Sequence, residues 1–186
     1  MNQTLYETAF DGATLGEMEE AFWRLLSENQ WPVDMAALTE VVVELADNAV
    51  LHSGDGKGWC SVQRADQPVE QLTVVIADRG VGIPYRVNQV VNDKRLDDYQ
   101  ALLLAFQRRF SSTGDPHRGF GLNIVLEYTG GVPGSMFSLE SGHAVYAARA
   151  GKGRVLSKGA RPVRGVTTRL TVPLRHSGAA AVSPFD

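Results

Sequence analysis

Two strand-like runs, residues 58–65 (GWCSVQRA) and 71–78 (QLTVVIAD), constrain the fold most strongly. The second run is almost continuously apolar, and the link between them, DQPVE, has the composition of a turn. Two strand-forming runs joined by such a short link predict an antiparallel hairpin, which is the start of a β-sheet. The remaining elements therefore have to be arranged around a sheet.

Further strand and helix patterns fill most of the remaining chain. Asp11 or Thr14 is placed to cap a first helix, and Pro32 with Asp34 to start a second one. Strand-like runs occur at residues 4–10, 135–141, 143–149 and 166–174, and helix-like runs at 15–28, 35–53, 96–109 and 120–131. Helices grouped with antiparallel strands favour an α+β fold, a two-layer sandwich with helices packed on one face of a mixed, mostly antiparallel sheet.

The length of the chain and its single cysteine limit its organisation. With 186 residues and 44% hydrophobic content, it is long enough for one core and too short for two comfortable domains. We therefore expect one domain over residues 1–176 and a disordered tail over 177–186. Cys60 alone can form neither an internal disulfide nor a cysteine-rich zinc site. No signal peptide and no apolar run of roughly 20 residues is present, so we expect a cytoplasmic protein without membrane contact.

Charge is distributed unevenly along the chain, although the net charge is only −3. Arg24 is the only Lys or Arg in the acidic first fifty residues, whereas residues 149–175 carry eight basic residues and no acid. Such a stretch could bind nucleic acid, phosphates or an acidic partner, but a solvated basic loop is the commoner outcome. We expect this loop to bulge between the last two strands, and we do not expect nucleic acid as a partner.

Polar residues interrupt the apolar pattern of the helix over residues 35–53. Glu44, Asn48 and His52 are spaced four apart, so they form one stripe on the helix surface. The stripe is displaced from the apolar arc, which gives the helix a core face and a separate polar edge. That edge fits either a binding site or the solvated side of an ordinary amphipathic helix. The arc consists of Leu38, Val41, Val42, Leu45, Ala46 and Ala49.

Two glycine-containing motifs follow. In the first, the apolar strand ends at Asp78 and continues into Gly80 and Gly82, which allow close backbone approach. In the second, Gly119 and Gly121 stand at the start of a predicted helix, where free N–H groups favour phosphate. Either motif alone also fits a simple turn.

The order of the three motifs carries more information than any one of them. E-x-x-x-N on a helix, D-x-G-x-G after a strand, G-x-G-L at a helix start and a strand at residues 165–174 resemble the GHKL superfamily. This superfamily comprises the ATP-binding domains of DNA gyrase, heat-shock chaperones, histidine kinases and mismatch-repair ATPases. The resemblance extends from about Leu5 to Leu174 and implies a Bergerat-type ATP-binding fold.

The resemblance implies ATP and Mg²⁺ as ligands and a role for each motif residue. Asn48 would supply an amide oxygen to Mg²⁺, and Glu44, one turn earlier, would be the general base. Asp78 would accept a hydrogen bond from the exocyclic amine of adenine. Gly80 and Gly82 would leave room for the base.

The remaining implied contacts surround the phosphates and the base. Residues 111–118 would form a lid over ATP, with His117 or Arg118 contacting phosphate. His52 would lie near the phosphates or be an ordinary surface histidine, and Thr168 would touch the adenine side. The residues that would offer backbone N–H groups to phosphate are Gly119, Phe120, Gly121 and Leu122.

Glu44 indicates which members of the superfamily this chain resembles, because sensor histidine kinases usually carry Asn or His at the first position of the E-x-x-x-N motif. A glutamate there resembles gyrase-like ATPases and the anti-sigma-factor serine/threonine kinases. The sequence before Thr4 has no space for paired dimerisation helices, so we expect no complete sensor kinase. We therefore expect an anti-sigma-factor-like serine/threonine kinase with a protein partner, and a homodimer is compatible with the sequence. The alternatives are a detached histidine-kinase catalytic domain acting in trans and a nucleotide-gated binding module with little turnover.

Overall fold

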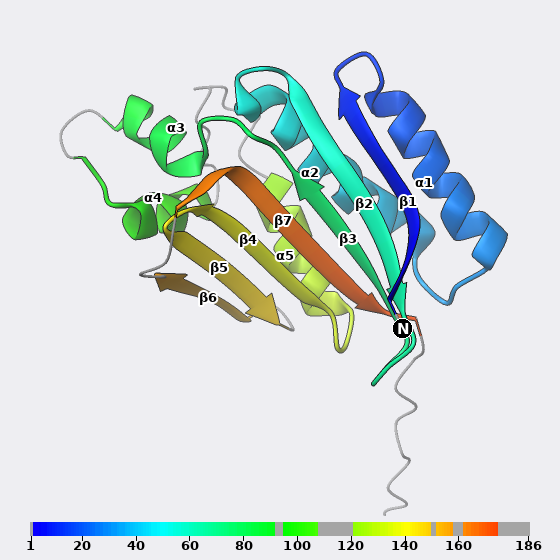
Figure 1. Ribbon diagram of the computed structural model, residues 1–186. Helices are drawn as coiled ribbons and strands as arrows, with labels where there is room; N and C mark the ends of the chain where they lie inside the picture. The colour runs from blue at the N-terminus through cyan, green and yellow to red at the C-terminus, as the bar shows by residue number, and fades with distance from the viewer. Residues whose placement is uncertain (1, 92–94, 108–120, 150–151, 158–161, 175–186) are drawn as a thin grey trace, which may run out of the picture.

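The computed structural model describes residues 2–91, 95–107, 121–149, 152–157 and 162–174 (Figure 1). Over these residues, seven strands form one sheet in the order β1-β2-β3-β7-β4-β5-β6, with every neighbouring pair antiparallel. The strands are β1 (Asn2–Asp11), β2 (Lys57–Ala65), β3 (Gln71–Ala77), β4 (Met136–Gly142), β5 (Ala144–Arg149), β6 (Lys152–Ser157) and β7 (Val163–Pro173). The predicted hairpin is confirmed as β2 paired with β3.

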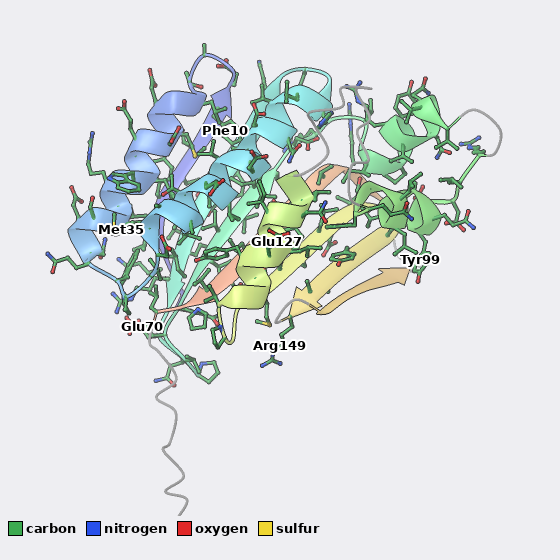
Figure 2. The ribbon with its side chains drawn as sticks, turned by 180° about the vertical axis from the view of Figure 1, so that it is seen from behind. Phe10, Met35, Glu70, Tyr99, Glu127 and Arg149 are labelled. Atoms are coloured by element: carbon green, nitrogen blue, oxygen red, sulfur yellow. The ribbon has the colours of Figure 1, made fainter. Side chains whose placement is uncertain are left out.

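Helices cover one face of this sheet, which confirms the predicted two-layer α+β sandwich. Helices α1 (Leu15–Asn29), α2 (Met35–Ser53) and α5 (Gly121–Gly131) lie side by side on that face, seen from their side in Figure 2. Two shorter helices, α3 (Ile83–Val90) and α4 (Asp98–Ala105), pack together near the turn between β4 and β5. Among the described helices, none is long and apolar enough to cross a membrane.

The apolar arc of α2 forms the centre of the core. All six of its predicted core residues are buried, at no more than 5% exposure, together with Val74 and Ile76 of β3. Burial of one such aliphatic side chain contributes about 1.5–3 kcal/mol, so the arc fixes the rotation of the helix about its own axis. Asp34 caps the helix as predicted, because its Oδ1 accepts a hydrogen bond from the Ala37 N–H at 3.0 Å. The polar stripe is therefore held at a defined edge of the core.

Two parts of the fold differ from the sequence-based expectation. Residues 83–90 form α3, although their pattern gave no helix prediction. Residues 152–157, expected within a bulging basic loop, form the edge strand β6, so the loop prediction is wrong there. Pairing with β5 satisfies backbone groups that a free edge would expose, and basic residues are common on edge strands. Arg164 and Arg169, from the same basic stretch, are exposed residues of β7.

Candidate functional site

The polar stripe of α2 meets the start of α5. A Cβ atom added at Gly121 would lie 2.6 Å from Glu44 Oε2 and 3.1 Å from Asn48 Nδ2. Both distances are shorter than ordinary contacts of about 3.5 Å. Only glycine lets the α5 backbone approach the two side chains this closely. The structure thus brings Glu44 and Asn48 together with Gly121, which lies more than seventy residues later in the sequence.

The chemistry of this junction suits a metal-bound phosphate. An amide oxygen is a ligand that Mg²⁺ accepts, and a carboxylate one helical turn away can hold a proton. Glu44 and Asn48 are half-buried, in contrast to the buried core arc beside them. Within the described residues, no group of three or more His, Cys, Asp or Glu side chains forms a candidate metal cluster. The amide oxygen of Asn48 thus fits the kind of ligand that Mg²⁺ takes.

Asp78 lies at the end of β3 with only 8% of its surface exposed. Its Oδ1 accepts a hydrogen bond from the Gly80 N–H at 2.7 Å, and its own N–H donates to the Val166 carbonyl at 2.9 Å. Burial raises the pKa of the Asp78 carboxyl, hydrogen bonding from the backbone of Gly80 and of Val166 opposes that rise, and the charge of Asp55 adds to it. The side chain is thus a buried acceptor whose orientation is fixed by neighbouring backbone groups.

Gly80 brings the loop after Asp78 against the end of α2. A Cβ atom at this position would lie 1.9 Å from the Ser53 carbonyl oxygen, which is too close for any side chain to fit. The loop containing Asp78 and the helix carrying Glu44 and Asn48 are therefore in direct backbone contact. The predicted contact of Gly80 and Gly82 with a base stays a prediction.

Thr168, His52 and Leu122 lie close to these elements. Thr168 is buried, and its Oγ1 donates to the Ile76 carbonyl at 3.1 Å. Because Thr168 and Ile76 are directly paired in the sheet, their side chains share the face that the helices cover. His52 is half-buried near the end of α2, and its carbonyl accepts a long hydrogen bond of 3.4 Å from Arg86 Nε. Leu122 packs against the core from the first turn of α5.

Part of the predicted site lies outside the described residues. The predicted lid at residues 111–118 falls there. So do the predicted phosphate contacts His117, Arg118, Gly119 and Phe120. Their roles stay predictions.

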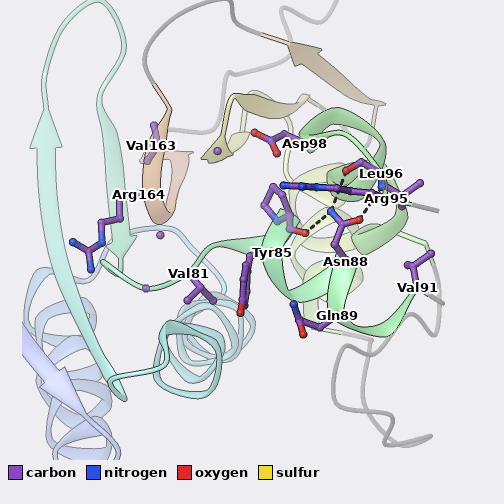
Figure 3. Close-up of a pocket in the computed structure, with 14 residues that line it drawn as sticks. Val81, Tyr85, Asn88, Gln89, Val91, Arg95, Leu96, Asp98, Val163 and Arg164 are labelled. Atoms are coloured by element: carbon purple, nitrogen blue, oxygen red, sulfur yellow. Dashed lines mark hydrogen bonds between the residues drawn. The ribbon is translucent and has the colours of Figure 1, made fainter. Parts of the chain in front are cut away.

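A cavity of about 760 Å³ lies on the other side of the loop from α2 (Figure 3). Gly80 and Val81 form one wall, and Tyr85, Arg95 and Arg164 form others. The side chain of Asn88 joins α3 to the following segment, because it donates to the Pro84 and Leu96 carbonyls and accepts from the Leu96 N–H. Glu44, Asn48 and Asp78 do not line this cavity. It is therefore separate from the junction of α2 with α5.

Two residues of the site were missed by the sequence analysis. A Cβ atom at Gly165, whose φ is +77°, would lie 2.6 Å from Asp78 Oδ1, so the backbone of this glycine lies directly against the carboxylate. Its position immediately before the last predicted strand was the available signal. Ser141 accepts a hydrogen bond from the Ile83 N–H at the start of α3. No local pattern distinguishes it, because its partners are distant in sequence.

Comparison with known proteins gives one result for this arrangement. The family described as histidine kinase-, DNA gyrase B-, and HSP90-like ATPase matches residues 33–176, from the cap of α2 to just beyond β7. A search of curated proteins finds no match.

Proposed function

Because the chain belongs to the histidine kinase-, DNA gyrase B- and HSP90-like ATPase family and is an ATP-binding domain of the GHKL superfamily, we propose that it is a magnesium-dependent serine/threonine protein kinase. The observation that carries the proposal is the contact of Glu44 and Asn48 with the start of α5. In this proposal the kinase is cytoplasmic, as we expected from the sequence, and regulates a protein partner in the manner of the anti-sigma-factor kinases.

Each residue has a distinct part in the proposed reaction. Asp78 binds the exocyclic amine of adenine through its carboxylate and so orients the nucleotide. Asn48 would supply an amide oxygen to Mg²⁺, which when bound would offset the negative charge of the phosphates. Glu44 takes the proton from a serine or threonine hydroxyl of the partner. The hydroxyl oxygen then bonds to the γ-phosphorus of ATP, and the bond from that phosphorus to the bridging oxygen breaks with its electron pair leaving on ADP.

The nature of residue 44 is compatible with a base. A carboxylate can accept a proton, which an asparagine cannot. One helical turn separates it from Asn48, so a proton acceptor and a metal ligand stand on the same edge of α2. The α5 backbone directly faces both.

The test is capture of a partner from cell extract by the full chain, with and without ATP and Mg²⁺, followed by mapping of phosphorylated residues. The proposal predicts acid-stable phosphoserine or phosphothreonine on a retained protein, and loss of that signal with Glu44→Gln. Acid-labile phosphohistidine would instead favour the trans-acting histidine kinase. ATP-dependent capture without any transfer would favour the nucleotide-gated binding module.

A further inference from the structure

Ser141, near the end of β4, joins two segments that are far apart in sequence. It is fully buried, with 0% of its surface exposed. Its Oγ accepts a hydrogen bond from the Ile83 N–H at 3.0 Å and donates one to the Gly165 carbonyl at 2.8 Å. One hydroxyl group thus connects the first turn of α3 with the beginning of β7.

The bond to Ile83 substitutes for a missing helix cap. The N-cap residue of α3 is Gly82, which has no side chain to accept an N–H from the first turn. Pro84, the next residue after Ile83, has no N–H at all. Ser141 therefore supplies the cap from another strand. It approaches so closely that a Cβ atom at Gly82, whose φ is +79°, would lie 2.8 Å from its Oγ.

Both segments joined by Ser141 also hold Asp78. On one side, Gly82 ends the loop whose Gly80 N–H donates to Asp78 Oδ1. On the other side, Gly165 backs Asp78 Oδ1, and the neighbouring Val166 carbonyl accepts the Asp78 N–H. Ser141 itself does not contact the carboxylate. Its hydroxyl instead connects the two segments that contact Asp78.

We propose that Ser141 is a positioning residue for base recognition, which sets the orientation of the Asp78 carboxylate and thereby the preference of this chain for adenine. The inference rests on the proposed role of Asp78 and goes beyond it, because it assigns base selectivity to a buried serine on a different strand. Loss of the hydroxyl removes the link that Ser141 makes between the first turn of α3 and Gly165, and the Asp78 N–H bond to Val166 remains. The carboxylate then samples orientations that miss the exocyclic amine.

The experiment measures binding of two nucleotides to the full chain by titration calorimetry. ATP carries the exocyclic amine, and purine riboside triphosphate lacks it. Ser141→Ala should weaken the binding of ATP about threefold to tenfold, as expected for the loss of one or two neutral hydrogen bonds. It should leave the affinity for purine riboside triphosphate unchanged. This ligand lacks the amine, so it does not make the hydrogen bond to Asp78 that Ser141 is proposed to orient. An equal loss for both nucleotides, or no loss for either, would overturn the proposal.

Ser135, the residue immediately before β4, provides the matched control. It is also fully buried, and its Oγ lies 2.7 Å from both the Thr129 and the Val132 carbonyl oxygens, within hydrogen-bond distance of each. Ser135→Ala should lower the melting temperature about as much as Ser141→Ala without changing the ratio of the two nucleotide affinities. If Ser141→Ala does not fold, Ser141→Cys keeps the side-chain shape with a weaker donor and acceptor, and the same ratio is measured.

A double-mutant cycle separates failure of this inference from failure of the Asp78 assignment. Ser141→Ala should have no further effect on ATP affinity once Asp78→Asn is present. If Asp78→Asn alone leaves ATP affinity unchanged, the role of Asp78 is wrong. If Asp78→Asn weakens ATP and Ser141→Ala changes neither ATP affinity nor the affinity ratio, only the positioning role is wrong.

Discussion

Gly121→Ala is the change that tests most specifically whether the junction of α2 with α5 is a reaction centre. The new methyl group would lie 2.6 Å from Glu44 Oε2 and 3.1 Å from Asn48 Nδ2. Restoring ordinary contact distances requires the carboxylate to move by about 1 Å. Because the carboxylate is the far end of a flexible side chain, it can shift while the helix backbone stays in place. The substitution therefore displaces the proposed base while leaving the fold intact.

A displacement of that size can lower a reaction rate by about 10²-fold when geometry is decisive. Stability should not fall, since alanine is favoured over glycine in helices by up to about 1 kcal/mol. We expect a melting temperature at or above that of the wild type and a rate of γ-phosphate release or transfer about 10²-fold lower. Single-turnover measurement with radiolabelled ATP checks the rate.

Gly131→Ala is the control in the same helix. Gly131 is the last residue of α5, and an added Cβ atom there has no neighbour within 4 Å. This variant should match the wild type in rate and gain similar helix stability. A wild-type rate for Gly121→Ala would refute the placement of chemistry at Glu44, and an equal loss in Gly131→Ala would assign the defect to the helix as a whole.

Three further changes probe the same site. Asp78→Asn should weaken ATP binding roughly tenfold to a hundredfold, because a hydrogen bond to a charged acceptor contributes about 1.5–3 kcal/mol. An unchanged dissociation constant, measured by calorimetry, would show that Asp78 does not contact the nucleotide. Burial raises the Asp78 pKa, so ionisation of the folded protein opposes stability above that pKa, and Asp78→Asn should melt no lower than the wild type at pH 7.5. As the pH falls, the carboxyl group gains its proton at a higher pH than an ordinary aspartate, so wild-type ATP affinity should approach that of Asp78→Asn. A ratio of the two affinities that stays constant until the protein unfolds in acid would contradict this. Asn48→Ala should abolish the Mg²⁺-dependent part of ATP binding while leaving adenosine binding unchanged. If the wild type binds ATP equally well with Mg²⁺ and with a chelator, the proposed metal ligand role of Asn48 is wrong.

The residues of α2 were predictable because their signal is local. Helical periodicity alone separates Leu38, Val41 and Leu45 from the stripe of Glu44 and Asn48, and all of the predicted arc is buried. Likewise, the strand ending in Asp78 is recognisable from its own composition. The two-layer fold follows from such local patterns, because each element has one apolar face to cover.

Other parts depend on contacts between distant segments and leave no local pattern. The strand character of residues 152–157 arises only when β5 offers them an edge to pair with. The start of α3 is capped by Ser141, 58 residues later in the chain. Gly165 is required because Asp78 lies against it in space. In each case, the constraint becomes visible only once the partner segment is in place.

The most direct test of the central claim is Glu44→Gln, measured for ATP affinity and for phosphoryl transfer in the same preparation. Glutamine keeps the size of the side chain but cannot take up a proton, so ATP and Mg²⁺ should bind within about threefold of the wild type while transfer slows by about 10²–10⁴-fold. If Glu44→Gln transfers phosphate at the wild-type rate, the carboxylate is only the polar edge of a core helix and the proposed mechanism is wrong.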